Sequence, residues 1–132
     1  MVYLVTIPLL YYEFVIIGIG IDVQDINRLT RLMQRTPNML DKFLSKNEKS
    51  YSEKGIMSVI VSKEALLKAT STYIKLDLST IQFSHHEDGR PHFMNLPEEL
   101  GRNSGVNIFV SISHSPETIV GIVIVDSDKV YK

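Results

Sequence analysis

One stretch decides the fold prediction: Phe14-Val15-Ile16-Ile17-Gly18-Ile19-Gly20-Ile21-Asp22. Its β-branched residues predict a buried strand over residues 14–21. Residues 23–35 follow with an apolar stripe at helical spacing, which predicts an amphipathic helix that ends at Thr36-Pro37. The stripe consists of Val23, Ile26, Leu29, Leu32 and Met33. Asp22 therefore lies at the junction between the strand and the helix.

The rest of the chain interleaves helical and extended patterns. Helices are predicted at about 45–53 and 57–72, with a helical turn at 97–100. Strands are predicted near 79–84, 91–94, 107–113 and 118–125. The turn Glu87-Asp88-Gly89-Arg90 joins the first two of these strands as a hairpin. Because hairpins dominate the second half, we predict an α+β fold with an antiparallel sheet packed by helices.

Length and composition limit the possible functions. A chain of 132 residues fits one domain, and 44% hydrophobic with 22% charged residues is typical of a globular protein. The net charge of −1 does not favour a nucleic-acid partner. The absence of cysteine excludes disulfides, thiolate zinc sites and a cysteine nucleophile. A reducing cytoplasm is the predicted location.

The first residues need a separate interpretation. Residues 1–14 form an apolar amino-terminal extension ahead of a predicted domain over 15–132. No Lys or Arg precedes the apolar run and no small-residue cleavage site follows it, so a signal peptide is not favoured. Pro8 and Glu13 interrupt the run, which favours an extension with a strand over a membrane segment. A membrane-associated leader remains the alternative.

Two carboxylates and a lysine are the first candidates for chemistry. Asp22 follows a strand that contains two glycines, and its alternative role is that of a helix N-cap. Glu64 and Lys68 are four residues apart and share one helix face, where the alternative is a solvent-facing ion pair. A pair of carboxylates without histidine or thiolate fits Mg²⁺, which takes its other oxygens from water and a substrate phosphate.

Histidines and arginines supply further candidates. Ser113 and His114 stand at the end of a strand, where a hydroxyl and an imidazole can bind phosphate or a base. No nucleophile elbow occurs, so a serine hydrolase is a poor fit. A metal cluster of His85, His86 and His92 is a weaker alternative to ordinary turn histidines. The first helix carries a basic face, or a solvated charged stripe, made of Arg28, Arg31 and Arg35.

Taken in order, five motifs resemble the holo-acyl-carrier-protein synthase family of 4′-phosphopantetheinyl transferases. They are Gly18-Ile19-Gly20-Ile21-Asp22, then Phe43-Leu44-Ser45 with Glu48 and Tyr51, then Lys63-Glu64-Ala65-Leu66-Leu67-Lys68, then Gly89-Arg90-Pro91, and Ser111-Ile112-Ser113-His114. The resemblance spans about residues 15–126. No single motif is decisive, but their order and spacing are specific.

The resemblance implies a reaction at the β-phosphate of coenzyme A, in which a serine of apo acyl carrier protein attacks and 3′,5′-ADP leaves. It implies that Asp22 and Glu64 hold Mg²⁺ and that Lys68 neutralises the pyrophosphate. Glu64, or a water beside Asp22, would take the serine proton. Gly89-Arg90-Pro91 and Ser113-His114 would line the nucleotide pocket. Arg28 and Arg35 would dock the carrier protein, and the assembly would be a homotrimer that serves fatty acid biosynthesis.

Two departures from the family pattern concern the helix that carries Glu64. Val59-Ile60-Val61-Ser62 replaces a segment with an arginine and an aromatic residue, and Thr70-Ser71-Thr72-Tyr73 replaces an aromatic residue with two glycines. Both replacements lie where contacts to coenzyme A are expected. The alternative function is therefore a non-catalytic relative that binds coenzyme A or the carrier protein without transfer.

Overall fold

A computed structural model describes residues 14–128. Apart from Phe14, the predicted extension lies outside the described residues. The elements are β1 (Val15–Asp25), α1 (Ile26–Arg35), η1 (Pro37–Lys42), η2 (Glu48–Ser50), α2 (Glu53–Thr70), η3 (Leu78–Thr80), β2 (Gln82–His85), β3 (Pro91–Met94), η4 (Glu98–Leu100), β4 (Val106–His114) and β5 (Thr118–Ser127). The predicted α+β class with an antiparallel sheet is confirmed. Within residues 14–128, no helix combines the length and apolarity needed to cross a bilayer.

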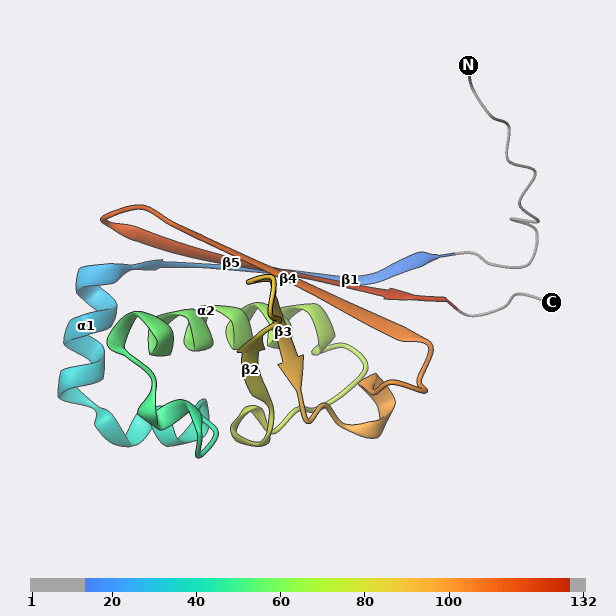
Figure 1. Cartoon of the computed structure of the whole chain (residues 1–132), viewed down its shortest axis with the longest axis horizontal. Coiled ribbons are helices and arrows are strands. Elements are labelled where there is room, and N and C mark those ends of the chain that lie inside the picture. The colour runs from blue at the N-terminus through green and yellow to red at the C-terminus, as the bar shows by residue number, and fades with distance from the viewer. Residues whose placement is uncertain (1–13, 129–132) are drawn as a thin grey trace, which may run out of the picture.

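The main sheet has three antiparallel strands in the order β1-β5-β4, and α2 lies along one of its faces (Figure 1). A separate hairpin of β2 and β3 lies on the other side of α2 (Figure 1). Because α2 is enclosed between the two, apolar residues occur all round it, as expected of a buried helix. The core joins Val59 and Leu66 of α2, Phe83 and Phe93 of the hairpin, and Val123 of β5.

Glycines determine how closely α2 approaches the sheet. A Cβ at Gly20 would collide with the carbonyl oxygen of Ala65 and lie 2.8 Å from the amide nitrogen of Ala69. A Cβ at Gly18 would collide with the carbonyl oxygen of Ala69. The missing side chains thus allow backbone contact between β1 and α2, which fixes the lateral position of the helix.

The strand predicted over residues 14–21 is present, but it is buried on one face only. The strand extends to Asp25, and its outward side chains remain exposed, with Ile19 at 59% and Ile21 at 53%. Helix α2 covers the glycine-bearing face, whereas none of the described elements covers the opposite face (Figure 1). Alternation of glycine and isoleucine therefore marks a strand whose bulky side chains all lie on the second face.

Two predicted helix boundaries were also wrong. The first helix begins at Ile26 because Asp25, and not Asp22, is its N-cap, and the Asp25 carboxylate accepts a 2.8 Å hydrogen bond from the Arg28 amide. The helix predicted at 45–53 is only the short turn η2. Its Glu48 carboxylate accepts hydrogen bonds from the backbone amides of Ser45 and Phe83, which stabilises an irregular loop instead.

Candidate active site

Asp22 lies on the inner face of β1 and faces α2, with 7% of its surface exposed. Its carboxylate accepts a 3.0 Å hydrogen bond from the side-chain amide of Gln24 and lies 3.3 Å from the Lys68 ammonium. Lys68 also donates to the carbonyl oxygen of Ile21 at 2.9 Å. The alternative role of Asp22 as a helix cap is excluded, because the residue lies within the strand.

Glu64 stands one turn before Lys68 on α2 and is half-buried. Burial raises the pKa of its carboxyl group, and the neighbouring charge of Asp22 raises that pKa further, while Lys68 acts in the opposite direction. The structure thus brings Asp22, Glu64 and Lys68 together. Two carboxylates beside one ammonium leave an excess negative charge, and this oxygen donor set fits Mg²⁺.

Burial of the Glu64 carboxylate, together with the neighbouring charge of Asp22, predicts that Glu64→Gln stabilises the protein in the absence of divalent cations. Because the folded state raises the pKa of Glu64, folding loses stability as the pH rises through that pKa. We expect a gain of about 0.5 kcal/mol at neutral pH, after discounting for water around a half-exposed group. Urea unfolding at several pH values would measure it.

Two controls define this prediction. The gain in stability should vanish at a pH below 4.5, the ordinary pKa of glutamate, because the wild-type side chain is also neutral there. Mg²⁺ at about 100 times its dissociation constant should stabilise the wild-type protein by about 2.7 kcal/mol and the variant far less. A variant less stable than wild type at neutral pH would show that burial and the charge of Asp22 do not disfavour the ionised Glu64 carboxylate.

A groove surrounds the first turns of α2. Its larger part, about 780 Å³, lies between α2 and the β4–β5 turn, where His114 and Ser115 line it. A second hollow of about 440 Å³ shares Gly55 and Ser58 with the first and reaches His85 of β2. The two hollows adjoin the same first turns of α2, and the larger one has room for part of a nucleotide.

Ser113 and His114 lie on opposite faces of β4. Both are exposed, but only His114 faces the groove, and the adjacent groove residue is Ser115 instead of Ser113. Ser113 pairs with Val120 on the outward face of the sheet. The structure therefore does not bring these two predicted binding residues together within one chain.

Gly89, Arg90 and Pro91 form the tip of the β2–β3 hairpin. Gly89 adopts a positive φ of 88°, which explains a glycine at this turn. The Arg90 guanidinium donates to the Asp88 carboxylate at 2.7 Å. These residues line neither part of the groove as it is formed by the described residues.

The three hairpin histidines do not form a metal cluster. The rings of His86 and His92 stack with centroids 3.8 Å apart, which directs their nitrogen atoms past each other. Residues 14–128 contain no group of three or more histidine or carboxylate side chains able to hold a metal ion. That alternative is not supported.

The basic face of α1 is exposed as predicted from the spacing. Arg28, Arg31 and Arg35 are all accessible, and none of them forms an ion pair with the described carboxylates. Leu32 lies between them with 38% of its surface exposed. The three guanidinium groups thus form an accessible basic surface on α1.

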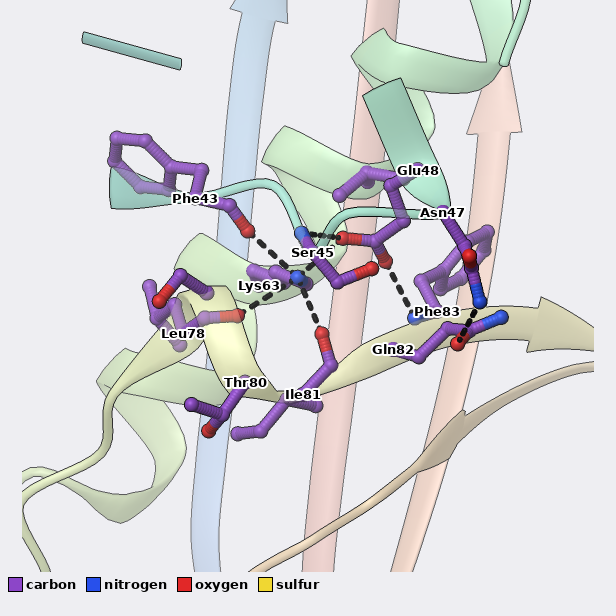
Figure 2. A network of polar contacts seen from close by, with 12 residues as sticks. Phe43, Ser45, Asn47, Glu48, Lys63, Leu78, Thr80, Ile81, Gln82 and Phe83 are labelled. Atoms are coloured by element: carbon purple, nitrogen blue, oxygen red, sulfur yellow. Dashed lines mark hydrogen bonds and ion pairs between the residues drawn. The ribbon is translucent and has the colours of Figure 1, made fainter. Parts of the chain in front are cut away.

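Sequence reasoning missed a buried ion pair between Lys63 and Glu48 (Figure 2). Both side chains are fully buried, and the ammonium lies 2.5 Å from the carboxylate. Burial lowers the pKa of Lys63, and the hydrogen bond and charge of Glu48 act against that change. The sequence offers little signal for this pair, because Lys63 stands between the polar residues Ser62 and Glu64.

The structure accounts for the two departures on α2. Val59 and Val61 are fully buried, and a Cβ at Gly121 would lie 2.5 Å from the Val61 side chain, so β5 packs tightly here. Tyr73 donates from its hydroxyl to the carbonyl oxygen of Ala69 at 3.1 Å. The first replacement therefore serves packing between α2 and β5, whereas Tyr73 of the second remains 43% exposed.

Comparison with known proteins agrees with this architecture. Residues 18–114 match the model of the 4′-phosphopantetheinyl transferase superfamily. A holo-[acyl-carrier-protein] synthase from Listeria monocytogenes is 30% identical over 119 residues, which cover 83% of this chain and 97% of the relative.

Solved structures give the same result. A holo-(acyl-carrier-protein) synthase from Bacillus anthracis in complex with CoA (3′,5′-ADP) superposes with a TM-score of 0.68 and 25% identity, covering 86% of this chain and 98% of that one. The Helicobacter pylori enzyme in complex with coenzyme A has a TM-score of 0.67 and 26% identity, covering 81% and 98%.

Proposed function

Since the chain belongs to the 4′-phosphopantetheinyl transferase superfamily, we propose that it transfers the 4′-phosphopantetheine arm of coenzyme A to a serine of apo acyl carrier protein. The products are the holo carrier protein and 3′,5′-ADP, and the pathway served is fatty acid biosynthesis. The observation that carries the proposal is the cluster of Asp22, Glu64 and Lys68 between β1 and α2. The predicted cytoplasmic location stays a prediction.

In this reaction the serine oxygen forms a bond to the β-phosphorus of coenzyme A, and the bond from that phosphorus to the bridging oxygen breaks. Asp22 and Glu64 would hold Mg²⁺, which supplies positive charge to the pyrophosphate. Lys68 adds an ammonium on the same side, next to Asp22. Glu64, next to Asp22 and Lys68, is also the candidate acceptor of the serine proton.

We assign the nucleotide to residues from different faces of the chain. His114 faces the groove, Gly89-Arg90-Pro91 form the hairpin tip, and Ser113 lies on the outward sheet face. One ligand that meets all of them, together with Lys68, requires residues from two copies of the chain. This dispersion supports a site between subunits.

The outward sheet face supports an oligomer, which we propose to be a homotrimer. Apolar side chains from all three strands lie there, and Val23 and Phe109 are 57% and 56% exposed. A contiguous apolar surface of this kind marks an interface between proteins. Sedimentation equilibrium should give the mass of three 15.0-kDa chains; a monomer at micromolar concentration would contradict the assembly.

Intact-mass spectrometry tests the transferase activity directly. An apo acyl carrier protein incubated with this protein, coenzyme A and Mg²⁺ should gain the mass of one phosphopantetheine arm, and EDTA should prevent the gain. No gain with several carrier proteins, from folded protein that still binds coenzyme A, would favour the non-catalytic binding relative.

Charge reversal tests the docking role of α1. Arg28→Glu combined with Arg35→Glu should raise KM for the carrier protein by about tenfold or more at low ionic strength, because electrostatic steering is lost. The loss should shrink at 0.5 M salt, where screening is strong. Arg102→Glu, which changes an exposed arginine outside α1, is the matched control. A salt-independent effect would remove these arginines from the docking surface.

A further inference from the structure

The Lys63–Glu48 pair connects α2 to segments that have few other backbone partners. The Lys63 ammonium donates to the backbone carbonyl oxygens of Phe43, Leu78 and Ile81 at 2.6–2.8 Å, besides its contact with Glu48 (Figure 2). These carbonyls belong to the loop after η1 and to the segment from η3 to β2. One ammonium thus satisfies buried carbonyl groups from two loops.

Glu48 extends the connection to the hairpin. One carboxylate oxygen accepts from the Ser45 amide at 2.7 Å, and the other accepts from the Phe83 amide at 2.6 Å. Phe83 is the second residue of β2, so the buried pair reaches the hairpin backbone directly. Both charged side chains have no exposed surface, which keeps water from competing with these hydrogen bonds.

The hairpin depends on such contacts for its position. Its two strands pair only with each other and share no hydrogen-bonded ladder with the main sheet. An isolated two-stranded hairpin is marginally stable in water. Besides apolar packing, the described contacts that hold β2 are the pair itself, a 2.8 Å bond from the Tyr51 hydroxyl to the Phe83 carbonyl, and a 3.2 Å bond from Asn47 to Gln82.

We propose that Lys63 and Glu48 are positioning residues for coenzyme A: their buried pair fixes the β2–β3 hairpin, with its tip Gly89-Arg90-Pro91, against the helix that carries Glu64 and Lys68. The inference rests on the proposed function. Loss of the pair weakens the binding of coenzyme A and leaves the transfer step nearly unchanged, because the pair does not contact Asp22, Glu64 or Lys68.

The test compares Glu48→Gln and the double variant Lys63→Met with Glu48→Gln. The first keeps the shape of the side chain but leaves the Lys63 ammonium without its carboxylate. The second leaves no charge in the core but removes the donor to three backbone carbonyls. The control is Asp41→Asn with Lys49→Met, which removes an exposed ion pair from the same region of the chain. Circular dichroism verifies the fold at the assay temperature.

We expect KM and the calorimetric Kd for coenzyme A to rise at least tenfold in the test variants, with kcat within about threefold of wild type. Hydrogen exchange of the backbone amides in residues 82–94 should accelerate at least tenfold, while amides of β5 keep their protection. The control variant should match wild type in every measurement.

Two results would overturn the inference: unchanged hairpin exchange in the folded variants, or a fall in kcat at constant KM. Absence of transfer by the wild-type protein would instead reject the proposed function. Hairpin exchange would still decide the role of the pair in that case, because it requires no activity.

Discussion

Asp22→Asn is expected to lower kcat/KM for transfer at least a thousandfold while the protein stays folded. The substitution keeps the size of the side chain and its hydrogen bond with Gln24, and removes the negative charge at the candidate metal position. Catalysis of phosphoryl transfer depends mainly on positioning and on neutralisation of charge at the phosphates. Intact-mass kinetics at saturating Mg²⁺ would measure the loss.

Asp25→Asn is the matched control for Asp22→Asn. Asp25 lies on the same strand three residues later, and its carboxylate caps α1. Asparagine caps helices about as well as aspartate, so this variant should retain both stability and transfer. Comparable turnover by the two variants would show that Asp22 does not hold the metal ion.

Much of the fold was predictable because local patterns and tertiary packing agree. The alternation in β5 matches one buried face. Of the stripe predicted for the first helix, Leu29 is buried with Ile26 and Met33 packed beside it, whereas Val23 belongs to β1 and Leu32 is exposed. The spacing of Glu64 and Lys68 placed both on one side of α2, where the structure brings them to Asp22. The five motifs in order were sufficient to identify the family, which the comparisons confirmed.

The parts that failed depend on contacts between distant segments. Asp22 is a plausible cap by sequence, and only the pairing of β1 with β5 as far as Asp25 excludes that role. Ile19 and Ile21 predict burial by composition, but a second layer over them is absent from the described fold. A hydrophobic pattern thus predicts that a side chain packs against another element, but it does not identify that element.

The buried pair of Lys63 and Glu48, with its hydrogen bonds, could not be predicted for a different reason. Lys63 and Glu48 are separated by 15 residues, and three of the four acceptors of Lys63 are backbone carbonyls, which no side-chain pattern reveals. A lysine between Ser62 and Glu64 is compatible with an exposed, a buried or a functional role. Three-dimensional contacts are required to choose between those roles.

Gly20→Ala is expected to destabilise the protein by about 3 kcal/mol or more, the upper end of the cost of overpacking. The added methyl group would meet the backbone of α2 at Ala65 and Ala69, where no side-chain rotation relieves the contact. Helix α2 would have to move away from β1, and Glu64 and Lys68 would move away from Asp22. Transfer should therefore fall even at temperatures where the variant is folded.

Gly101→Ala separates this effect from a general cost of replacing glycine. Its φ of −80° suits alanine, and the nearest atoms to an added Cβ lie at 3.5 Å, an ordinary contact. We expect a change within about 1 kcal/mol, in the stabilising direction, because alanine restricts the unfolded chain. Urea midpoints of both variants would give the comparison. Equal stability of Gly20→Ala and wild type would mean that α2 is free to shift on the sheet, and that direct backbone contact does not set the distance between Asp22 and Glu64.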